Sequence, residues 1–240
     1  MKDLSGQVAI VTGGSSGIGR AVALALAEAG VTVVVCGRRL AALEQTVAAI
    51  RAKSGQALAV QADVTQAEAV AHVVETTVQH FGTVDILINN AGIGGGGYIH
   101  EHDLATWDQV MAVDLRGPFL FARAVLPLMR RQKRGHIINI SSESGLEYYP
   151  GNGAYGVAKH ALNALGEFIQ RENQELNIRV NTICPGMVVT EMTEDSPGLD
   201  HDKCLQGQDI AELVVWLLTR RTNIKIGRPV LIQTMANPWT

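Results

Sequence analysis

The sequence predicts an α/β protein built as a doubly wound parallel sheet of seven strands with helices on both faces. Apolar runs of strand length alternate along the chain with segments in which apolar residues recur at helical spacing. The strand-length runs are apolar at consecutive positions, which indicates a sheet that is covered on both sides. Strict alternation of strand and helix then implies parallel strands joined by right-handed crossovers.

Seven runs are predicted to be strands, and six segments between them are predicted to be helices. In chain order the strands are VAIV at 8–11, VTVVVC at 31–36, ALAVQA at 57–62, VDILIN at 84–89, HIINIS at 136–141, IRVNTIC at 178–184 and PVLIQ at 229–233. The helices are expected at 17–29, 40–53, 66–80, 103–131, 154–175 and 208–219, because apolar residues repeat there with the helical period. The helix at 103–131 is not expected to be straight, since Gly117 and Pro118 interrupt it and proline removes a backbone donor.

Composition narrows the class of protein. The chain has 240 residues and a net charge of −3, so we expect one domain spanning 1–240 and no nucleic-acid partner. Its apolar runs are far shorter than the roughly 20 residues that span a bilayer, and its first residues lack the layout of a signal peptide. We therefore expect a cytoplasmic protein without a membrane partner. The three cysteines are widely spaced, which suggests neither a disulfide framework nor a metal site.

A glycine-rich loop follows the first predicted strand. In TGGSSGIGR, the residues Gly13, Gly17 and Gly19 form a GxxxGxG arrangement that opens a helix, where a pyrophosphate can approach backbone N–H groups. A nucleoside-triphosphate loop would need a lysine and a hydroxyl next, but Arg20 and Ala21 stand there. A purely structural glycine turn is the other reading. The position between a strand and an Ala-rich helix favours dinucleotide binding.

The end of the second predicted strand indicates which dinucleotide. A carboxylate there would bind a ribose 2′-OH, whereas arginine suits a 2′-phosphate. The chain has Cys36, Gly37, Arg38 and Arg39 at this point, with two guanidinium groups and no acid. We therefore predict NADP(H) over NAD(H), the alternative being that these arginines only solvate the start of a helix.

Polar and small residues follow the next strands. Asp63 ends the third strand, where its carboxylate could accept a hydrogen bond from the adenine amino group. The sequence NNAG (89–92) ends the fourth strand, where small residues leave room for the adenosine ribose. Either feature alone could be a strand-end turn, but they recur at successive strand ends, where ligands bind in such sheets.

Tyr155 and Lys159 are four residues apart on a predicted helix, so their side chains share one face. The segment 150–153 breaks the chain just before them, which places Tyr155 in the first turn. The positive end of the helix and the nearby ammonium both favour the phenolate, as a proton donor and acceptor near neutral pH requires. Ser142 follows the fifth strand, in position to reach the same pocket.

These motifs together resemble the classical short-chain dehydrogenase/reductase family over essentially the whole chain. They are TGGSSGIG, NNAG, Ser142, the Tyr155-x-x-x-Lys159 pair and PGMVVT at 185–190, in this order. The resemblance implies a Rossmann-type domain, commonly a homotetramer or dimer, that uses a nicotinamide cofactor without a metal. The substrate would be a small carbonyl compound or the corresponding alcohol.

The resemblance also implies roles for individual residues. Tyr155 would exchange the proton with the substrate oxygen, Ser142 would orient that oxygen, and Lys159 would bind the nicotinamide ribose. The cofactor would contact Gly13, Ser15, Ser16, Gly17, Ile18, Gly19, Arg38, Arg39, Asp63, Val64, Asn89, Ala91, Gly92, Tyr155, Lys159, Pro185, Gly186, Val188 and Thr190. The last two of these residues would hold the carboxamide.

Two departures from the family pattern bear on function. The family usually has asparagine in the fourth catalytic position, where it supports a water relay to the lysine, but VDLRG places Asp114 there. The chain also ends in VLIQTMANPWT instead of a glycine-rich tail. Because of Asp114, a dinucleotide-binding regulator or scaffold with little turnover stays open beside the NADP-dependent carbonyl reductase, while the different tail weakens inferences about the substrate.

The segment 191–208 is expected to be a short substrate lid. It carries five acids, at positions 191, 194, 195, 200 and 202, against one lysine. An acidic carrier or carboxylate substrate would be repelled there, which favours neutral or cationic carbonyl compounds. The alternative is that these charges point into solvent.

Overall fold

In the computed structural model, which describes residues 3–239, all seven strands lie in one parallel sheet. The strands are β1 (Val8–Thr12), β2 (Thr32–Gly37), β3 (Ala57–Gln61), β4 (Ile86–Asn89), β5 (Gly135–Ile140), β6 (Ile178–Pro185) and β7 (Val230–Ile232). Their order across the sheet is β3-β2-β1-β4-β5-β6-β7. The order reverses between β1 and β4, which is where ligands bind in open sheets of this kind. The predicted fold class is confirmed.

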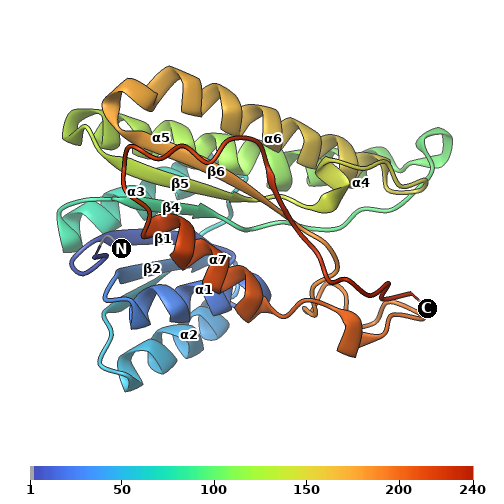
Figure 1. The fold of residues 1–240 in the computed structure, drawn as a ribbon, viewed down its shortest axis with the longest axis horizontal. Coiled ribbons are helices and arrows are strands. Elements are labelled where there is room, and N and C mark those ends of the chain that lie inside the picture. Colours follow the sequence, from blue (N-terminus) through green and yellow to red (C-terminus); the bar gives the residue numbers. More distant parts are fainter. Residues whose placement is uncertain (1–2, 240) are drawn as a thin grey trace.

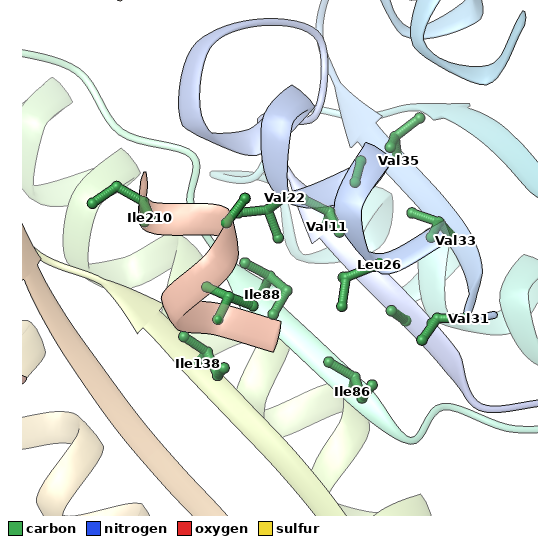
Figure 2. Packing of buried hydrophobic residues seen from close by; sticks show 14 of the residues in the cluster. Val11, Val22, Leu26, Val31, Val33, Val35, Ile86, Ile88, Ile138 and Ile210 are labelled. Atoms are coloured by element: carbon green, nitrogen blue, oxygen red, sulfur yellow. The ribbon is translucent and has the colours of Figure 1, made fainter. Parts of the chain in front are cut away.

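The main helices cover both faces of the sheet (Figure 1). They are α1 (Gly17–Glu28), α2 (Leu40–Ala52), α3 (Ala67–Phe81), α4 (Leu104–Met111), α5 (Gly117–Gln132), α6 (Gly153–Asn173) and α7 (Gly207–Leu218). Two apolar cores result, one between the sheet and α1, α2 and α7, the other between the sheet and α3, α5 and α6. Figure 2 shows part of the first core, in which Val22 and Leu26 of α1 lie near Val11 and Ile88 of the sheet, and to which Ile210 of α7 also belongs.

The predicted long helix at 103–131 is broken into three pieces. Between α4 and α5 lies a π-helical turn, η2 (Ala112–Arg116), directly before Gly117 and Pro118. Pro118 has no N–H to donate to the carbonyl of residue 114, so regular α-helical bonding cannot continue through this point. The break therefore lies where the sequence predicted it. Its consequence is a wide turn that presents Asp114 to the carboxyl edge of the sheet.

Among the described residues, no helix has the length and apolar content needed to cross a membrane.

Candidate active site

The glycine loop takes a conformation that only small residues permit. Gly13 and Gly17 have positive φ angles of 66° and 51°, and a Cβ on Gly19 would overlap the carbonyl oxygen of Gly13. Asn90, just after β4, donates from Nδ2 to the carbonyl oxygens of Thr12 (2.9 Å) and Gly13 (3.3 Å). The loop is thus anchored to the neighbouring strand end across the switch in strand order.

The loop leaves the amino end of α1 open to an anion. Ser16 is the N-cap residue of α1, but its hydroxyl donates to Glu191 (3.1 Å) instead of capping the helix. The first N–H groups of a helix and its positive dipole end attract phosphate. Glycines that could not carry a Cβ also bring the backbone within reach of a ligand. The glycine loop therefore fits the phosphates of a dinucleotide.

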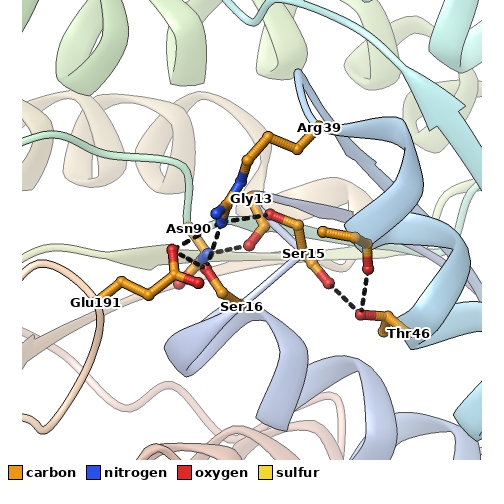
Figure 3. Close-up of polar contacts among 9 residues, drawn as sticks. Gly13, Ser15, Ser16, Arg39, Thr46, Asn90 and Glu191 are labelled. Carbon is orange, nitrogen blue, oxygen red and sulfur yellow. Dashed lines mark hydrogen bonds and ion pairs between the residues drawn. The ribbon is translucent and has the colours of Figure 1, made fainter.

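Arg38 and Arg39 are both exposed after the end of β2, and Arg39 lies beside the glycine loop. The Arg39 guanidinium donates to the hydroxyls of Ser15 (3.2 Å) and Ser16 (2.9 Å) and to Glu191 (2.8 Å), as Figure 3 shows. It is therefore engaged with the glycine loop and does more than solvate the start of α2. The hydrogen bond from Arg39 lowers the pKa of the Glu191 carboxyl, outweighing partial burial.

The third and fourth strand ends differ in how they use their polar side chains. Asp63 accepts from the N–H (2.9 Å) and hydroxyl (2.8 Å) of Thr65, forming a tight turn. Asn89 is buried and donates to Asn139 of β5 (2.9 Å), so its side chain is engaged within the sheet. Val64 is buried at the same edge.

Tyr155, Lys159 and Asp114 come together on the far side of the switch. Lys159 lies one turn after Tyr155 on α6, and its Nζ is 5.2 Å from the centre of the Tyr155 ring. The same Nζ lies 3.0 Å from Oδ2 of Asp114 and donates to the carbonyl of Ile140 at the end of β5 (3.3 Å). Asp114 Oδ1 accepts from the N–H of Ile93 (2.9 Å). The carboxylate thus bridges the lysine and the loop that follows NNAG.

This ion pair is enclosed. Lys159 is 3% exposed and Asp114 is 0% exposed. Burial lowers the pKa of Lys159, but the charge of Asp114 and the neighbouring Tyr155 outweigh it, so the net effect is a raised pKa. A Cβ on Gly92 would lie 2.9 Å from Asp114 Oδ2, which explains the glycine of NNAG. The ammonium therefore stays charged beside Tyr155.

Ser142 starts the short 3₁₀ turn η3 (Glu143–Gly145) that follows β5. Its Oγ accepts from the N–H of Ser144 (3.1 Å). Asn163 of α6 donates to the carbonyl of Gly145 (2.8 Å), so the turn is fixed against the helix that carries Tyr155. The serine and the tyrosine are thus held by two elements in direct contact.

Tyr148, Tyr149 and Glu143 precede Tyr155 in the chain and make contacts of different kinds. Tyr148 stacks on His160 with ring centroids 4.9 Å apart. Burial and the nearby Glu143 carboxylate raise the pKa of Tyr149. Glu143 also accepts from Gln233, which follows β7. Glu143, the residue after Ser142, therefore contacts both Tyr149 and Gln233.

The 185–190 segment leaves β6 at the same edge. Pro185 and Val188 are buried, while Gly186 and Thr190 are half-buried. A Cβ on Gly17 would lie 3.2 Å from the Thr190 methyl group, so this segment rests on the glycine loop. The lid segment then returns to pair with it, since Val189 donates to Leu205 (2.9 Å) and Leu205 donates to Met187 (2.9 Å).

Sequence reasoning missed the contacts of Asn90, Glu191 and Gln233. The NNAG motif was an available signal for Asn90, but nothing local distinguishes which of its two asparagines faces the loop. The sequence pattern marks Glu191 only as one of the five acids of the lid segment. Its partner Arg39 is 152 positions away, a distance that no local pattern bridges.

Comparison with known proteins agrees with this geometry. The sequence matches the short chain dehydrogenase family over residues 7–198. A 3-oxoacyl-[acyl-carrier-protein] reductase from Synechocystis sp. is 41% identical over 196 residues, which cover 81% of this chain and 79% of the relative.

Solved structures give the same result over more of the chain. Levodione reductase superposes with a TM-score of 0.89 at 29% identity, covering 96% of this chain and 97% of that protein. A metagenomic short-chain oxidoreductase in complex with NADP has a TM-score of 0.85 at 34% identity, covering 98% of this chain and 100% of that protein. This chain therefore belongs to the short-chain dehydrogenase/reductase family of oxidoreductases.

Proposed function

We propose that this protein is an NADP(H)-dependent reductase or dehydrogenase that interconverts a ketone or aldehyde and the corresponding alcohol. The observation that carries the proposal is the enclosed contact of Lys159 with Asp114, next to Tyr155 on the same helix face. A charged ammonium beside a phenol favours the phenolate, which is the form that accepts a proton from an alcohol.

The residues divide the work as follows. The nicotinamide cofactor, when bound, supplies or accepts the hydride. Tyr155 gives a proton to the carbonyl oxygen in reduction and takes it back in oxidation, while Ser142 orients that oxygen with its hydroxyl. Lys159 keeps a positive charge beside Tyr155, and Asp114 holds the ammonium in place.

The preference for NADP(H) rests on Arg38 and Arg39. No carboxylate ends β2, and the guanidinium of Arg39 already binds two hydroxyls of the glycine loop. An arginine in this position suits a 2′-phosphate. The metagenomic relative was solved with NADP, which supports the assignment.

For the substrate we propose a neutral or cationic carbonyl compound. Glu143 and Glu147 stand near Tyr149, and both carboxylates contribute to its raised pKa. The lid adds the exposed acids Glu194 and Asp195. An acidic carrier protein would be repelled by this surface.

The test is NADPH oxidation against a panel of ketones, aldehydes and cyclic diketones, with Tyr155→Phe as the variant. We expect measurable turnover in the wild type and at least a hundredfold loss in the variant, a typical contribution of general acid–base catalysis. NADPH affinity should be retained, because the phenyl ring keeps its packing. Turnover that survives in Tyr155→Phe would remove the tyrosine from the mechanism. NADPH binding without turnover on any panel member would favour the regulator or scaffold.

A further inference from the structure

The Glu191 carboxylate occupies an anion site made by residues assigned to cofactor binding. Its Oε2 accepts from Arg39 (2.8 Å) and from the hydroxyl of Ser16 (3.1 Å), as Figure 3 shows. Arg39 also reaches Ser15 (3.2 Å). A guanidinium flanked by two hydroxyls suits a phosphate as well as a carboxylate. An internal anion therefore lies on the donors that an incoming phosphate would use.

The ion pair between Arg39 and Glu191 is weak enough for an external anion to displace it. The Arg39 and Glu191 side chains are 56% and 58% exposed, and exposed ion pairs of this kind are weak. A phosphate carries more negative charge than a carboxylate and has three acceptor oxygens. It therefore outcompetes Glu191 for the same guanidinium.

Glu191 is presented by a segment that is braced independently of Arg39. Thr193 donates from Oγ1 to the carbonyl of Val188 (2.6 Å) and accepts from the N–H of Thr190 (3.0 Å). The backbone of Glu194 donates to Thr190 (2.9 Å). The turn thus keeps its shape without the ion pair, and the Glu191 side chain is a separable link from the lid segment to the glycine loop.

We propose that Glu191 is a specificity-determining residue that competes with the 2′-phosphate of NADP(H) for Arg39. This inference rests on the proposed cofactor preference. Before the cofactor binds, Arg39 is paired with Glu191 in some molecules and free in the others. Only a free Arg39 can bind the phosphate. The apparent affinity for NADP(H) is the intrinsic affinity multiplied by the fraction of molecules in which Arg39 is free, so pairing with Glu191 lowers it. NAD(H), which has no 2′-phosphate, does not meet this competitor.

The test is the dissociation constants of NADPH and NADH, measured by calorimetry without substrate, for the wild type and Glu191→Gln. We expect the variant to bind NADPH roughly two- to sixfold more tightly, as removal of a weak exposed ion pair allows. NADH affinity should stay unchanged. Equal tightening for NADH would overturn the inference, because the competition would then not involve the 2′-phosphate.

Two further variants separate this effect from general electrostatics. Glu194→Gln removes the same charge from the same exposed turn and should leave NADPH affinity unchanged. In an Arg39→Ala background, adding Glu191→Gln should give no tightening. Tightening by Glu194→Gln to the same degree, or tightening that persists without Arg39, would also overturn the inference.

A separate measurement tests the assignment of NADP(H) as the cofactor. Arg39→Ala alone should weaken NADPH binding and leave NADH binding unchanged. An unchanged ratio of the two affinities would exclude Arg39 from phosphate recognition and overturn the inference, and the same result with Arg38 and Arg39 both changed to alanine would also overturn the cofactor assignment. A changed ratio with no effect of Glu191→Gln would overturn only the role of Glu191.

Discussion

Asp114 replaces a neutral amide of the family with a charge at the centre of the site. Its carboxylate forms an enclosed ion pair with Lys159, with Nζ and Oδ2 3.0 Å apart. Removing one partner of such a pair typically costs about 3–5 kcal/mol, because the other charge is left buried and uncompensated. The pair therefore contributes to the stability of the fold and to the electrostatic environment of Tyr155.

The pH range in which this pair matters follows from the raised pKa of Lys159. A cation whose pKa is raised on folding stabilises the fold fully below its unfolded value, here 10.5, and loses that contribution only as pH rises through the folded value. The ion pair is therefore intact throughout the neutral range. A change of activity near neutral pH therefore does not report loss of the pair.

Asp114→Asn should move the pH dependence of alcohol oxidation toward acid. The amide keeps the shape of the side chain and its hydrogen bond from Ile93, but it no longer neutralises the Lys159 ammonium. The measurement is kcat against pH, together with thermal unfolding of both proteins.

Asp85→Asn is the matched control for this change. Asp85 is also buried and paired, with Arg134, but it lies at the opposite end of the strands. It should lower the melting temperature without moving the pH profile. A profile for Asp114→Asn that is equally unmoved would show that Asp114 has only a structural role.

At the scale of single elements, the glycine loop and the broken helix determine the site. The glycine loop can be predicted from the sequence, because glycine is needed where one backbone segment closely approaches another. The helix break is also readable, since Gly117 and Pro118 cannot continue regular bonding. The consequence of the break cannot be predicted from the sequence, because only the π-helical turn of the folded chain directs the Asp114 side chain toward Lys159.

Gly19→Ala should abolish tight cofactor binding and destabilise the fold by about 1–3 kcal/mol. The added methyl group would overlap the carbonyl oxygen of Gly13, and backbone cannot move aside as a flexible side chain can. The measurements are NADPH affinity by fluorescence titration and the free energy of unfolding in urea.

Gly227→Ala provides the comparison. A Cβ there would meet no atom within 4 Å, so the same chemical change should alter neither quantity appreciably. If Gly19→Ala behaved like Gly227→Ala, the close approach within the glycine loop would not be required for binding.

At the scale of the whole molecule, the three cysteines are free and buried, and the thiol of Cys184 lies near Ser142 and Lys159 of the candidate site. Burial raises the pKa of Cys36 to about 12 and also raises the pKa values of Cys184 and Cys204. Only the thiolate reacts readily with disulfide reagents.

We therefore expect no fast-reacting thiol in the native protein and three per chain after unfolding in guanidinium. The measurement is the colour released by an aromatic disulfide reagent, followed over time with and without denaturant. Cys204, in the lid segment, should react first of the three in the native state. A stoichiometric fast thiol in native protein would show that the lid or the core opens more readily than the structure implies.

The sequence alone determined the fold class, the strand and helix positions, the glycine loop and the pairing of Tyr155 with Lys159 on one helix face. These features depend on periodicity and on near neighbours, so local patterns suffice to predict them. The tertiary structure decided that Asp114 meets Lys159, that Asn90 anchors the loop while Asn89 serves the sheet, and that Glu191 reaches Arg39. Such contacts join residues from distant parts of the chain. They depend on how parallel strands bring their carboxyl ends to one edge, and on which of several similar side chains the packing turns toward the site.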